Sequence, residues 1–319
     1  MRTSDGSSNK VLVMGGLIID QYLLVDQYPG RGEDVLISDS FKRVGGSTIN
    51  VACTLKNLGV DAYPVSTIGN DKYGSMIENY LLEVNIKKNC VRVDKGEATG
   101  YCLVIVDSSS ERTFMTYKGC EGKFSPALID DKLLTEIAFV YITGYYLQGQ
   151  DAAAVISFIK NIKESGASIM FDPGPLVDEI EPTILCSILT LSDVFIPNVK
   201  ELKKIKDKLA ITEEFNEWAI KYNINYLIIK NGNAGVIAYQ ANRRYQLPAF
   251  KVAAIDTTGA GDSFAAGCIY GFLNHLALEE ILKLGCACGA LSTTVVGPNA
   301  SFDIEDIKAV IKGEENHVR

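Results

Sequence analysis

The stretch Asp256-Thr257-Thr258-Gly259-Ala260-Gly261-Asp262-Ser263-Phe264 is the most informative part of the sequence. Two glycines separated by one alanine let backbone N–H groups approach an anion without obstruction by side chains. From Ser263 onward apolar residues recur at helical spacing, so we expect a helix to begin at this turn. Free amides at a helix N-terminus favour negative charge. The stretch therefore predicts an anion-binding turn formed by Gly259, Ala260 and Gly261.

The carboxylate of Asp262 lies next to a turn that is suited to bind an anion, so its presence there suggests a function. We interpret Asp262 as a base that takes a proton from a hydroxyl while the amides hold a phosphoryl group. The alternative is that Asp262 caps its own helix, but Thr257 and Thr258 already offer capping hydroxyls. His275 falls at the predicted helix end and His317 in the C-terminal tail, so a carboxylate is the available base.

Composition limits the class of protein. The chain has 319 residues, 47% of them apolar, which is enough for one large core. A net charge of −8 argues against nucleic acid or an anionic membrane as the main partner. No apolar run approaches the roughly 18 residues of a membrane-spanning helix, and the polar N-terminus does not resemble a signal peptide. We therefore expect a cytoplasmic protein that acts on small molecules.

The eight cysteines are scattered without a CxxC pair, and there are only two histidines. This pattern does not suggest a zinc site. We expect reduced thiols in the core.

Short apolar runs alternate with amphipathic helices along most of the chain. The first, at residues 11–19, is continuous and has the profile of one buried strand. We predict further strands at 61–68, 138–142, 168–171, 194–196 and 226–230, with helices at 47–58, 151–164 and 213–222. This alternation predicts an α/β fold with a mostly parallel sheet covered by helices on both faces.

Two segments, residues 21–42 and 98–117, read as strands and turns without a convincing helix. We expect them to pair into a small β-sheet that covers one edge of the body as a lid, since phosphoryl transfer requires that water be excluded. Static antiparallel extensions are the alternative. An uncovered strand edge on the lid suggests a homodimer formed through it.

Asn198 and Glu201 directly follow a predicted strand and lie three apart, on one side of a helix start. Their oxygens suit a hydrated Mg²⁺ carried by nucleotide phosphates. The same pair also matches a capping box, and the two interpretations are compatible.

Gly45 and Gly46 open the next predicted helix, where a polyol could lie against the backbone and Asn50 could bond a hydroxyl. Asp20 follows the first predicted strand, at the position where open α/β sheets bind ligands. A carboxylate there could accept bonds from two adjacent sugar hydroxyls. A solvated turn residue is the alternative for Asp20.

Two other segments are ambiguous. Residues 230–235 form either a hairpin turn or part of an adenine or phosphate pocket. Arg112 either reaches a substrate or pairs with Glu111 on a surface hairpin.

Together these motifs resemble the ribokinase-like (PfkB) carbohydrate kinase family, in the family's order from about Lys10 to Ile311. Gly45-Gly46 with Asn50 looks like its first signature, and the stretch from Asp256 to Asp262 like its second. The resemblance implies one Rossmann-like α/β domain with a β lid over residues 1–319. It also implies transfer of the ATP γ-phosphoryl group to a sugar hydroxymethyl group, with Mg²⁺ as cofactor.

The resemblance also implies roles for individual residues. Asp262 would be the base and the amides of residues 259–261 the anion hole. The remaining roles would be sugar binding by Asp20, Gly45, Gly46 and Asn50, nucleotide binding by Asn198, Lys230, Gly232 and Gly235, and contact with Mg²⁺ through water by Glu201. The family often binds a monovalent cation such as K⁺ beside the anion hole, and Asp256, Thr258 and Ser301 fall where its ligands would come from.

Departures from the family pattern narrow the range of expected acceptor substrates. Ser47 stands where kinases of phosphorylated hexoses carry a lysine, and Thr143-Gly144-Tyr145 replaces the acidic residue of ribokinases. Residues 111–114 are similar to fructokinases and ketodeoxygluconate kinases. We expect an ATP-dependent kinase for an unphosphorylated sugar or sugar acid of the ribose, fructose or ketodeoxygluconate type. Tyr145 and Tyr146 could stack on a base, so a nucleoside kinase of the adenosine or pseudouridine type is the alternative.

Overall fold

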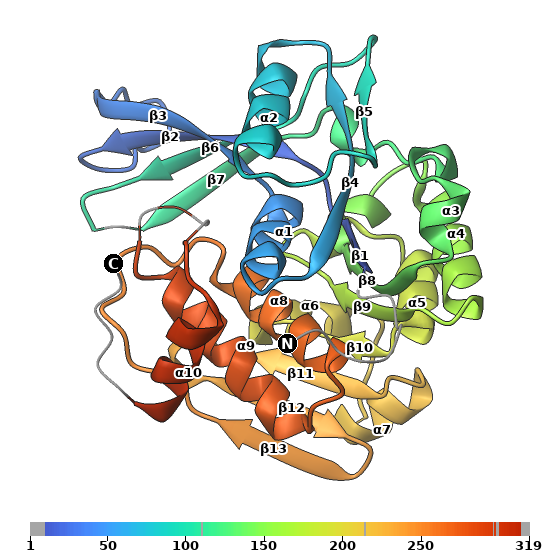
Figure 1. Ribbon diagram of the computed structural model, residues 1–319. Coiled ribbons are helices and arrows are strands. Elements are labelled where there is room, and N and C mark those ends of the chain that lie inside the picture. Colours follow the sequence, from blue (N-terminus) through green and yellow to red (C-terminus); the bar gives the residue numbers. More distant parts are fainter. Residues whose placement is uncertain (1–9, 110, 214, 296, 298–299, 314–319) are drawn as a thin grey trace.

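The computed structural model describes residues 10–313 apart from 110, 214, 296, 298 and 299. Within these residues nine strands form one sheet, in the order β13-β12-β11-β10-β9-β8-β1-β4-β5 (Figure 1). In this sheet β5, β4, β1, β8, β9, β10 and β11 run parallel to one another. The strands β12 and β13 join antiparallel at the β11 edge. Their bounds are β1 Lys10–Met14, β4 Asp61–Gly69, β5 Val91–Asp94, β8 Ile137–Thr143, β9 Ser168–Asp172, β10 Val194–Phe195, β11 Tyr226–Lys230, β12 Val236–Gln240 and β13 Arg243–Leu247. The predicted mostly parallel sheet is confirmed.

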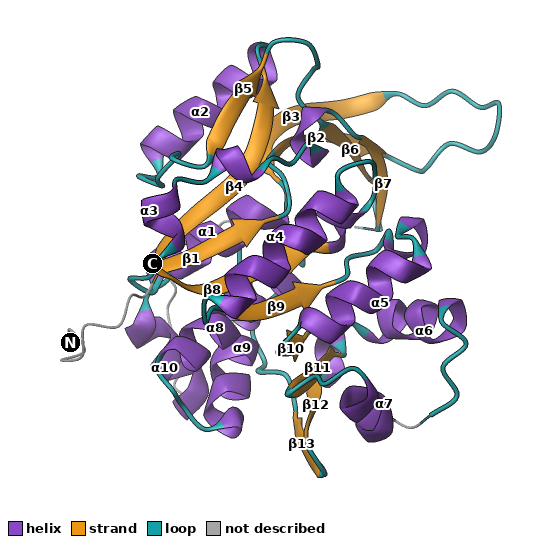
Figure 2. Cartoon of the chain, turned by 90° about the vertical axis from the view of Figure 1, so that its right-hand side faces the viewer, coloured by secondary structure: helices purple, strands orange, loops and turns teal. Residues whose placement is uncertain are grey.

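Helices cover both faces of this sheet (Figure 2). One face carries α3 Asp131–Leu134, α4 Ala152–Glu164, α5 Pro182–Leu191, α6 Val199–Lys208 and α7 Phe215–Lys221. The other carries α1 Ser47–Asn57, α2 Lys72–Glu83, α8 Ala260–Leu273 and α9 Leu278–Ser292, with α10 Ile304–Lys312 packed on α9. The helices predicted at 47–58, 151–164 and 213–222 therefore correspond to α1, α4 and α7.

The alternation of side chains along the buried strands divides the core into two layers. In β1, Leu12 and Met14 pack against α4 and α5, while Val11 and Val13 pack against α1 and α8. All four are fully buried, which explains why the strand reads as a continuous apolar run rather than an alternating one.

The predicted single strand at residues 11–19 is wrong. The structure ends β1 at Met14, turns at Gly15 and Gly16, and starts β2 Ile18–Val25 in a different sheet. Gly16 has a φ of 84°, and a Cβ there would lie 2.9 Å from Cγ of Glu121. A residue with a side chain would be strained in this turn, so the break depends on the glycine.

The second sheet, which we call the lid sheet, has the order β3-β2-β6-β7. Its other strands are β3 Ile37–Gly45, β6 Tyr101–Val106 and β7 Arg112–Tyr117. Tyr22 and Phe41 stack with ring centroids 4.7 Å apart over a small core of Cys102 and Val104. The predicted small sheet is confirmed, although it begins three residues earlier, at Ile18, than residue 21.

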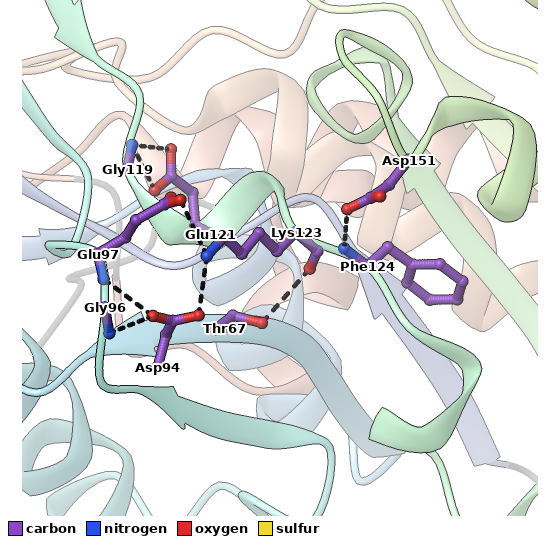
Figure 3. A network of polar contacts seen from close by, with 9 residues as sticks. All are labelled: Thr67, Asp94, Gly96, Glu97, Gly119, Glu121, Lys123, Phe124 and Asp151. Carbon is purple, nitrogen blue, oxygen red and sulfur yellow. Dashed lines mark hydrogen bonds and ion pairs between the residues drawn. The ribbon is translucent and has the colours of Figure 1, made fainter.

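A polar network holds the base of the lid sheet (Figure 3). The buried carboxylate of Glu121 accepts bonds from the N–H groups of Gly100 and Gly119, at the two points where the chain enters β6 and leaves β7. Beside it, Lys123 pairs with Asp94 at 2.9 Å and with Glu97 at 3.0 Å. The network therefore anchors two of the crossings between lid and body, the one into β6 and the one out of β7.

All eight cysteines are free thiols, and all except Cys186 are buried. The predicted reduced core thiols match this arrangement. Among the described residues, no helix is sufficiently long and apolar to cross a bilayer.

Candidate active site

A cleft opens at the carboxyl ends of the parallel strands. Strands β8, β9 and β11 end there, at Thr143, Asp172 and Lys230, and helices α6 and α8 begin there. The cleft has a volume of about 300 Å³ and is lined by Ser47, Thr143, Asp172, Gly174, Pro175, Asn198, Glu201, Lys230, Gly232, Gly259, Gly261 and Asp262. Ligands of open α/β folds bind at such strand ends.

The helix predicted to begin at this turn is α8, which starts at Ala260. Gly259 precedes the helix with a φ of 77°, and no side chain caps the first turn. The expectation that Thr257 and Thr258 provide capping hydroxyls is therefore wrong, and Asp262 does not cap the helix either. Gly259 and Gly261 line the cleft, so the backbone of this turn faces a space where an anion fits.

Asp262 lies one turn into this region, at the cleft wall. The side-chain amide of Asn50 donates a 2.7 Å hydrogen bond to its Oδ2. Burial raises the pKa of Asp262 to about 6, and the charge of Asp172 adds to the rise, while Asn50, Lys230 and Ser47 oppose it. A carboxylate with this pKa is ionised at neutral pH and still able to accept a proton.

Lys230 stands at the centre of the acidic groups in the cleft. Its Nζ donates to Oδ2 of Asp172 at 2.5 Å. Burial alone would lower the pKa of Lys230, but the carboxylates of Asp172 and Glu201 outweigh it, so the pKa is raised. The ammonium group therefore remains charged next to the turn at Gly261, whose Cβ position would lie 3.6 Å from Nζ.

Asn198 and Glu201 form the predicted capping box at the start of α6. Oδ1 of Asn198 accepts from the N–H of Glu201 at 2.9 Å, and Oε2 of Glu201 accepts from the N–H of Asn198 at 2.8 Å. Burial raises the pKa of Glu201 to about 7, with Asp172 and Asp262 adding to the rise and Lys230 opposing it. The described residues contain no cluster of three or more metal-ligating side chains. A metal ion here would therefore need water and phosphate oxygens as further ligands.

The predicted acceptor residues come together on the lid side of Asp262. Asp20 is not at the end of the first strand, as expected, but the third residue of β2. Its Oδ2 fills the space that a Cβ at Gly45 would occupy, so any other residue at position 45 would push the Asp20 side chain aside. Burial, with the charge of Asp262, raises the pKa of Asp20 to about 7. Asp20 is therefore not the solvated turn residue that was the alternative interpretation.

Besides the amide that bonds Asp262, Asn50 has a side-chain oxygen that could accept a hydrogen bond from a ligand. It is 5% exposed in α1, behind the N-cap Gly46, and its Oδ1 is buried without a hydrogen-bond partner in the described structure. Buried polar atoms normally find a partner. A substrate hydroxyl would supply one.

Tyr145 and Tyr146 differ in position. Tyr146 is 2% exposed and donates to the carbonyl of Val65 at 3.0 Å, so it belongs to the core and cannot stack on a base. Burial raises the pKa of Tyr145, and the charges of Asp262 and Asp20 add to the rise. Its ring lies beside Gly174 of the cleft lining, since a Cβ on Gly174 would be 3.6 Å from Cε2 of Tyr145. Of the two tyrosines, Tyr145 is therefore the one near the cleft.

Four other candidates lie in different places. Gly232 and Gly235 both lie in the β11–β12 hairpin, as one predicted alternative had it, and of the two Gly232 also lines the cleft. Ser301 is exposed in the loop before α10. Arg112 pairs with Asp256 at 2.7 Å rather than with Glu111.

Residues 8–305 match the model of the pfkB family carbohydrate kinases. The chain belongs to this family. It is 28% identical to the ATP-dependent ribose-1-phosphate kinase of Halopiger xanaduensis, over 95% of this chain and 98% of that protein. It is also 28% identical to a fructokinase of Klebsiella pneumoniae, over 94% and 98% of the two chains. Among solved structures, the nucleoside kinase of Burkholderia thailandensis in complex with inosine has a TM-score of 0.83 at 20% identity, covering 97% of this chain and 100% of that one.

In this pfkB-family kinase, sequence reasoning missed Asp172, which pairs with Lys230. It directly follows the strand predicted at 168–171, so the rule that drew attention to Asp20 could have found it. It also missed the hydroxyl of Thr48, which is buried and has no hydrogen-bond partner among the described residues. Thr143 was noted only as a departure from the ribokinase pattern, although its hydroxyl is buried in the same way and flanks Gly15 together with that of Thr48. No sequence pattern indicated Thr48.

Proposed function

We propose that this kinase transfers the γ-phosphoryl group of ATP to a hydroxymethyl group of a small sugar or sugar acid that carries no phosphate. The observation that supports this most directly is the position of Asp262. Asp262 belongs to the uncapped first turn of α8, its carboxylate accepts a hydrogen bond from Asn50, and its charge adds to the effect of burial in raising the pKa of Asp20. A proton acceptor thus stands between a site suited to a phosphoryl group and a site suited to hydroxyls.

Asp262 acts in this proposal as the base for the acceptor hydroxyl. Its hydrogen bond from Asn50 fixes the carboxylate, and its pKa of about 6 lies near the operating pH. General-base catalysis of this kind contributes roughly 10²–10⁴ in rate. The amides of residues 259–261 would stabilise negative charge on the moving phosphoryl group, a contribution that is typically as large.

The nucleotide phosphates would lie in the cleft between α6 and α8. Lys230 offers a charged donor, Asn198 an amide, and Gly232 a close approach of backbone. Glu201 and Asp172 suit a hydrated Mg²⁺, because carboxylate oxygens are its preferred protein ligands and both line the cleft. When bound, the ion neutralises charge on the transferred group.

The sugar would lie against Gly46, with Asp20 and the free Oδ1 of Asn50 as partners for its hydroxyls. Ser47 lines the cleft where a sugar-phosphate kinase would need a cation. A hydroxyl offers no charge for a phosphate, which favours an unphosphorylated acceptor. The related ribose-1-phosphate kinase makes the phosphorylated sugar the necessary comparison.

A nucleoside kinase is the second candidate. The ring of Tyr145 lies beside Gly174 in the cleft lining, where it could stack on a base. Saturation with a nucleoside at a lower KM than with any sugar would favour this candidate.

The deciding experiment measures ADP release with a panel of acceptors: ribose, fructose, ketodeoxygluconate, ribose 1-phosphate, adenosine and pseudouridine. Asp262→Asn should lower turnover on the best acceptor by roughly 10²–10⁴-fold or more, with nucleotide binding kept. Asp34→Asn, an exposed carboxylate in the loop between β2 and β3, is the matched control and should behave as the native protein. Near-normal turnover by Asp262→Asn would remove Asp262 from the base role.

A further inference from the structure

An arginine of the lid sheet reaches the loop that leads into α8. Arg112 is the first residue of β7, and its Nη2 lies 2.7 Å from Oδ1 of Asp256. Its Nη1 donates to the hydroxyl of Thr257 at 3.3 Å. The pair is well shielded from solvent, because the side chains are 16% and 4% exposed. Figure 1 shows the β6–β7 hairpin above this loop.

Every oxygen of the Asp256 carboxylate is engaged. Besides Arg112, Oδ1 accepts from the N–H of Thr258 at 2.7 Å, and Oδ2 accepts from the N–H of Gly297 at 2.9 Å. These bonds and the Arg112 charge outweigh the effect of burial, so the pKa of Asp256 is lowered. The carboxylate is held ionised and fully partnered.

The monovalent cation implied by the family resemblance does not fit this set of residues. Its expected ligands are Asp256, Thr258 and Ser301, but Asp256 is already paired and Ser301 is exposed. A second guanidinium, that of Arg43, comes within 3.2 Å of where a Cβ on Gly297 would lie. Among the expected ligands within the described residues, only Thr258 has a side-chain oxygen that is buried without a hydrogen-bond partner. A cation bound to Asp256 would lie next to the guanidinium group of Arg112, and like charges repel, so this set of residues is a poor site for a cation.

We propose that Arg112 takes the place of this cation: its guanidinium compensates the charge of Asp256, so that the kinase needs no K⁺. Arg112 is then a positioning residue. It holds Asp256, whose bonds to Thr258 and Gly297 shape the loop before Gly259, and through that loop it sets the anion-binding amides. The inference rests on the proposed function for its kinetic consequence only.

This arrangement couples the charge to the lid sheet. A bound ion belongs to the body of a protein, whereas Arg112 belongs to β7 and would leave Asp256 if the lid sheet moved away. Removing one partner of a shielded ion pair leaves an uncompensated charge, which is costly. The anion-binding turn therefore has its compensating charge only when the lid sheet covers the site.

The test compares K⁺ with choline at equal ionic strength, in the native kinase, Arg112→Met, Arg112→Lys and the control Arg31→Met. Arg31 is an exposed arginine in the β2–β3 loop. The native protein and Arg31→Met should release ADP equally in both salts. Arg112→Met should lose at least about tenfold of its activity in choline and regain part of it in K⁺, within the range of measured coupling between sites. Arg112→Lys, which keeps the charge, should remain independent of K⁺.

Unfolding temperatures without substrate give a readout that does not need activity. K⁺ should raise the unfolding temperature of Arg112→Met relative to choline and leave that of the native protein unchanged. A native protein that is activated or stabilised by K⁺ would overturn the proposal, as would an Arg112→Met variant indifferent to K⁺ in both assays. If the native protein phosphorylates no acceptor of the panel, the proposed function fails while the unfolding temperatures still decide this inference.

Discussion

At the scale of single residues, the site gathers carboxylates whose ionisation is unfavourable. Burial is the largest cause of a raised pKa in each of Asp20, Glu201 and Asp262, and the negative charge of Asp172 or Asp262 adds to each rise. Such perturbed groups cluster where a protein performs chemistry. They also cost stability, and the cost depends on pH.

Asp20 gives a prediction whose sign follows from its pKa. The folded protein holds a proton on Asp20 up to a pH of about 7, whereas the ordinary pKa of this side chain, which applies in the unfolded chain, is 3.8. The native state therefore binds more protons between these values, and stability falls as the pH rises through this range. Asp20 is partly exposed, so solvent reduces the effect. Asp20→Asn should raise the unfolding temperature at pH 8 by roughly 2–4 °C, the shift caused by about 1 kcal/mol.

Thermal unfolding at pH 8 and pH 5 measures this effect. At pH 5 the native Asp20 is largely protonated, and the gain should be smaller. Asp34→Asn, at an exposed position, should change neither value. An equal gain at both pH values would show that the ionisation of Asp20 is not its cause.

At the scale of elements, the capping box of α6 should serve two purposes: it stabilises the start of the helix, and its residue Asn198 should contact ATP. Asn198→Ala should destabilise the protein by about 1 kcal/mol, because the N–H of Glu201 loses its acceptor. It should also raise the KM for ATP, because Asn198 lines the cleft. Denaturant unfolding and ADP-release kinetics measure the two effects separately.

The matched control is Asp303, the N-cap of α10, which accepts from the N–H groups of Glu305 and Asp306. Asp303→Ala should lose similar stability and keep the native KM for ATP. If the two variants shift KM equally, Asn198 serves only as a cap.

The same scale shows what the sequence could predict. The strands at 61–68 and 168–171 were found within one residue because a buried parallel strand has a strong apolar pattern. The break at Gly15 and Gly16 was not predicted, because a continuous apolar run does not show that its two halves belong to different sheets. The proposed base Asp262, the proposed anion-binding turn at residues 259–261 and Asn50 followed from local motifs. The pair of Arg112 with Asp256 did not, because a contact between distant segments depends on where the lid sheet lies.

At the scale of the whole molecule, the lid sheet leaves a free edge at β7. Phe114, Met115 and Tyr117 on this strand are 57%, 48% and 50% exposed. An exposed apolar strand edge favours pairing with another chain. We propose that two copies of the kinase associate through their lid sheets, burying more than about 1,000 Å² as a specific interface requires.

Sedimentation equilibrium measures this association. The native kinase should sediment as a dimer, and Phe114→Ser should shift it toward the monomer. Leu82→Ser removes an equally exposed apolar side chain from α2 and should leave the dimer intact. A native protein that sediments as a monomer at all concentrations would contradict the proposal.

The buried thiols of this fold have a practical consequence. Alkylating reagents attack the thiolate, and burial raises the pKa of Cys53, Cys268 and Cys286 besides shielding them from the reagent. In the folded chain, Cys186 is the accessible target. The other seven become reactive only when the structure around them unfolds locally. The rate at which a maleimide modifies them therefore reports how often that part of the core unfolds, without any engineered label.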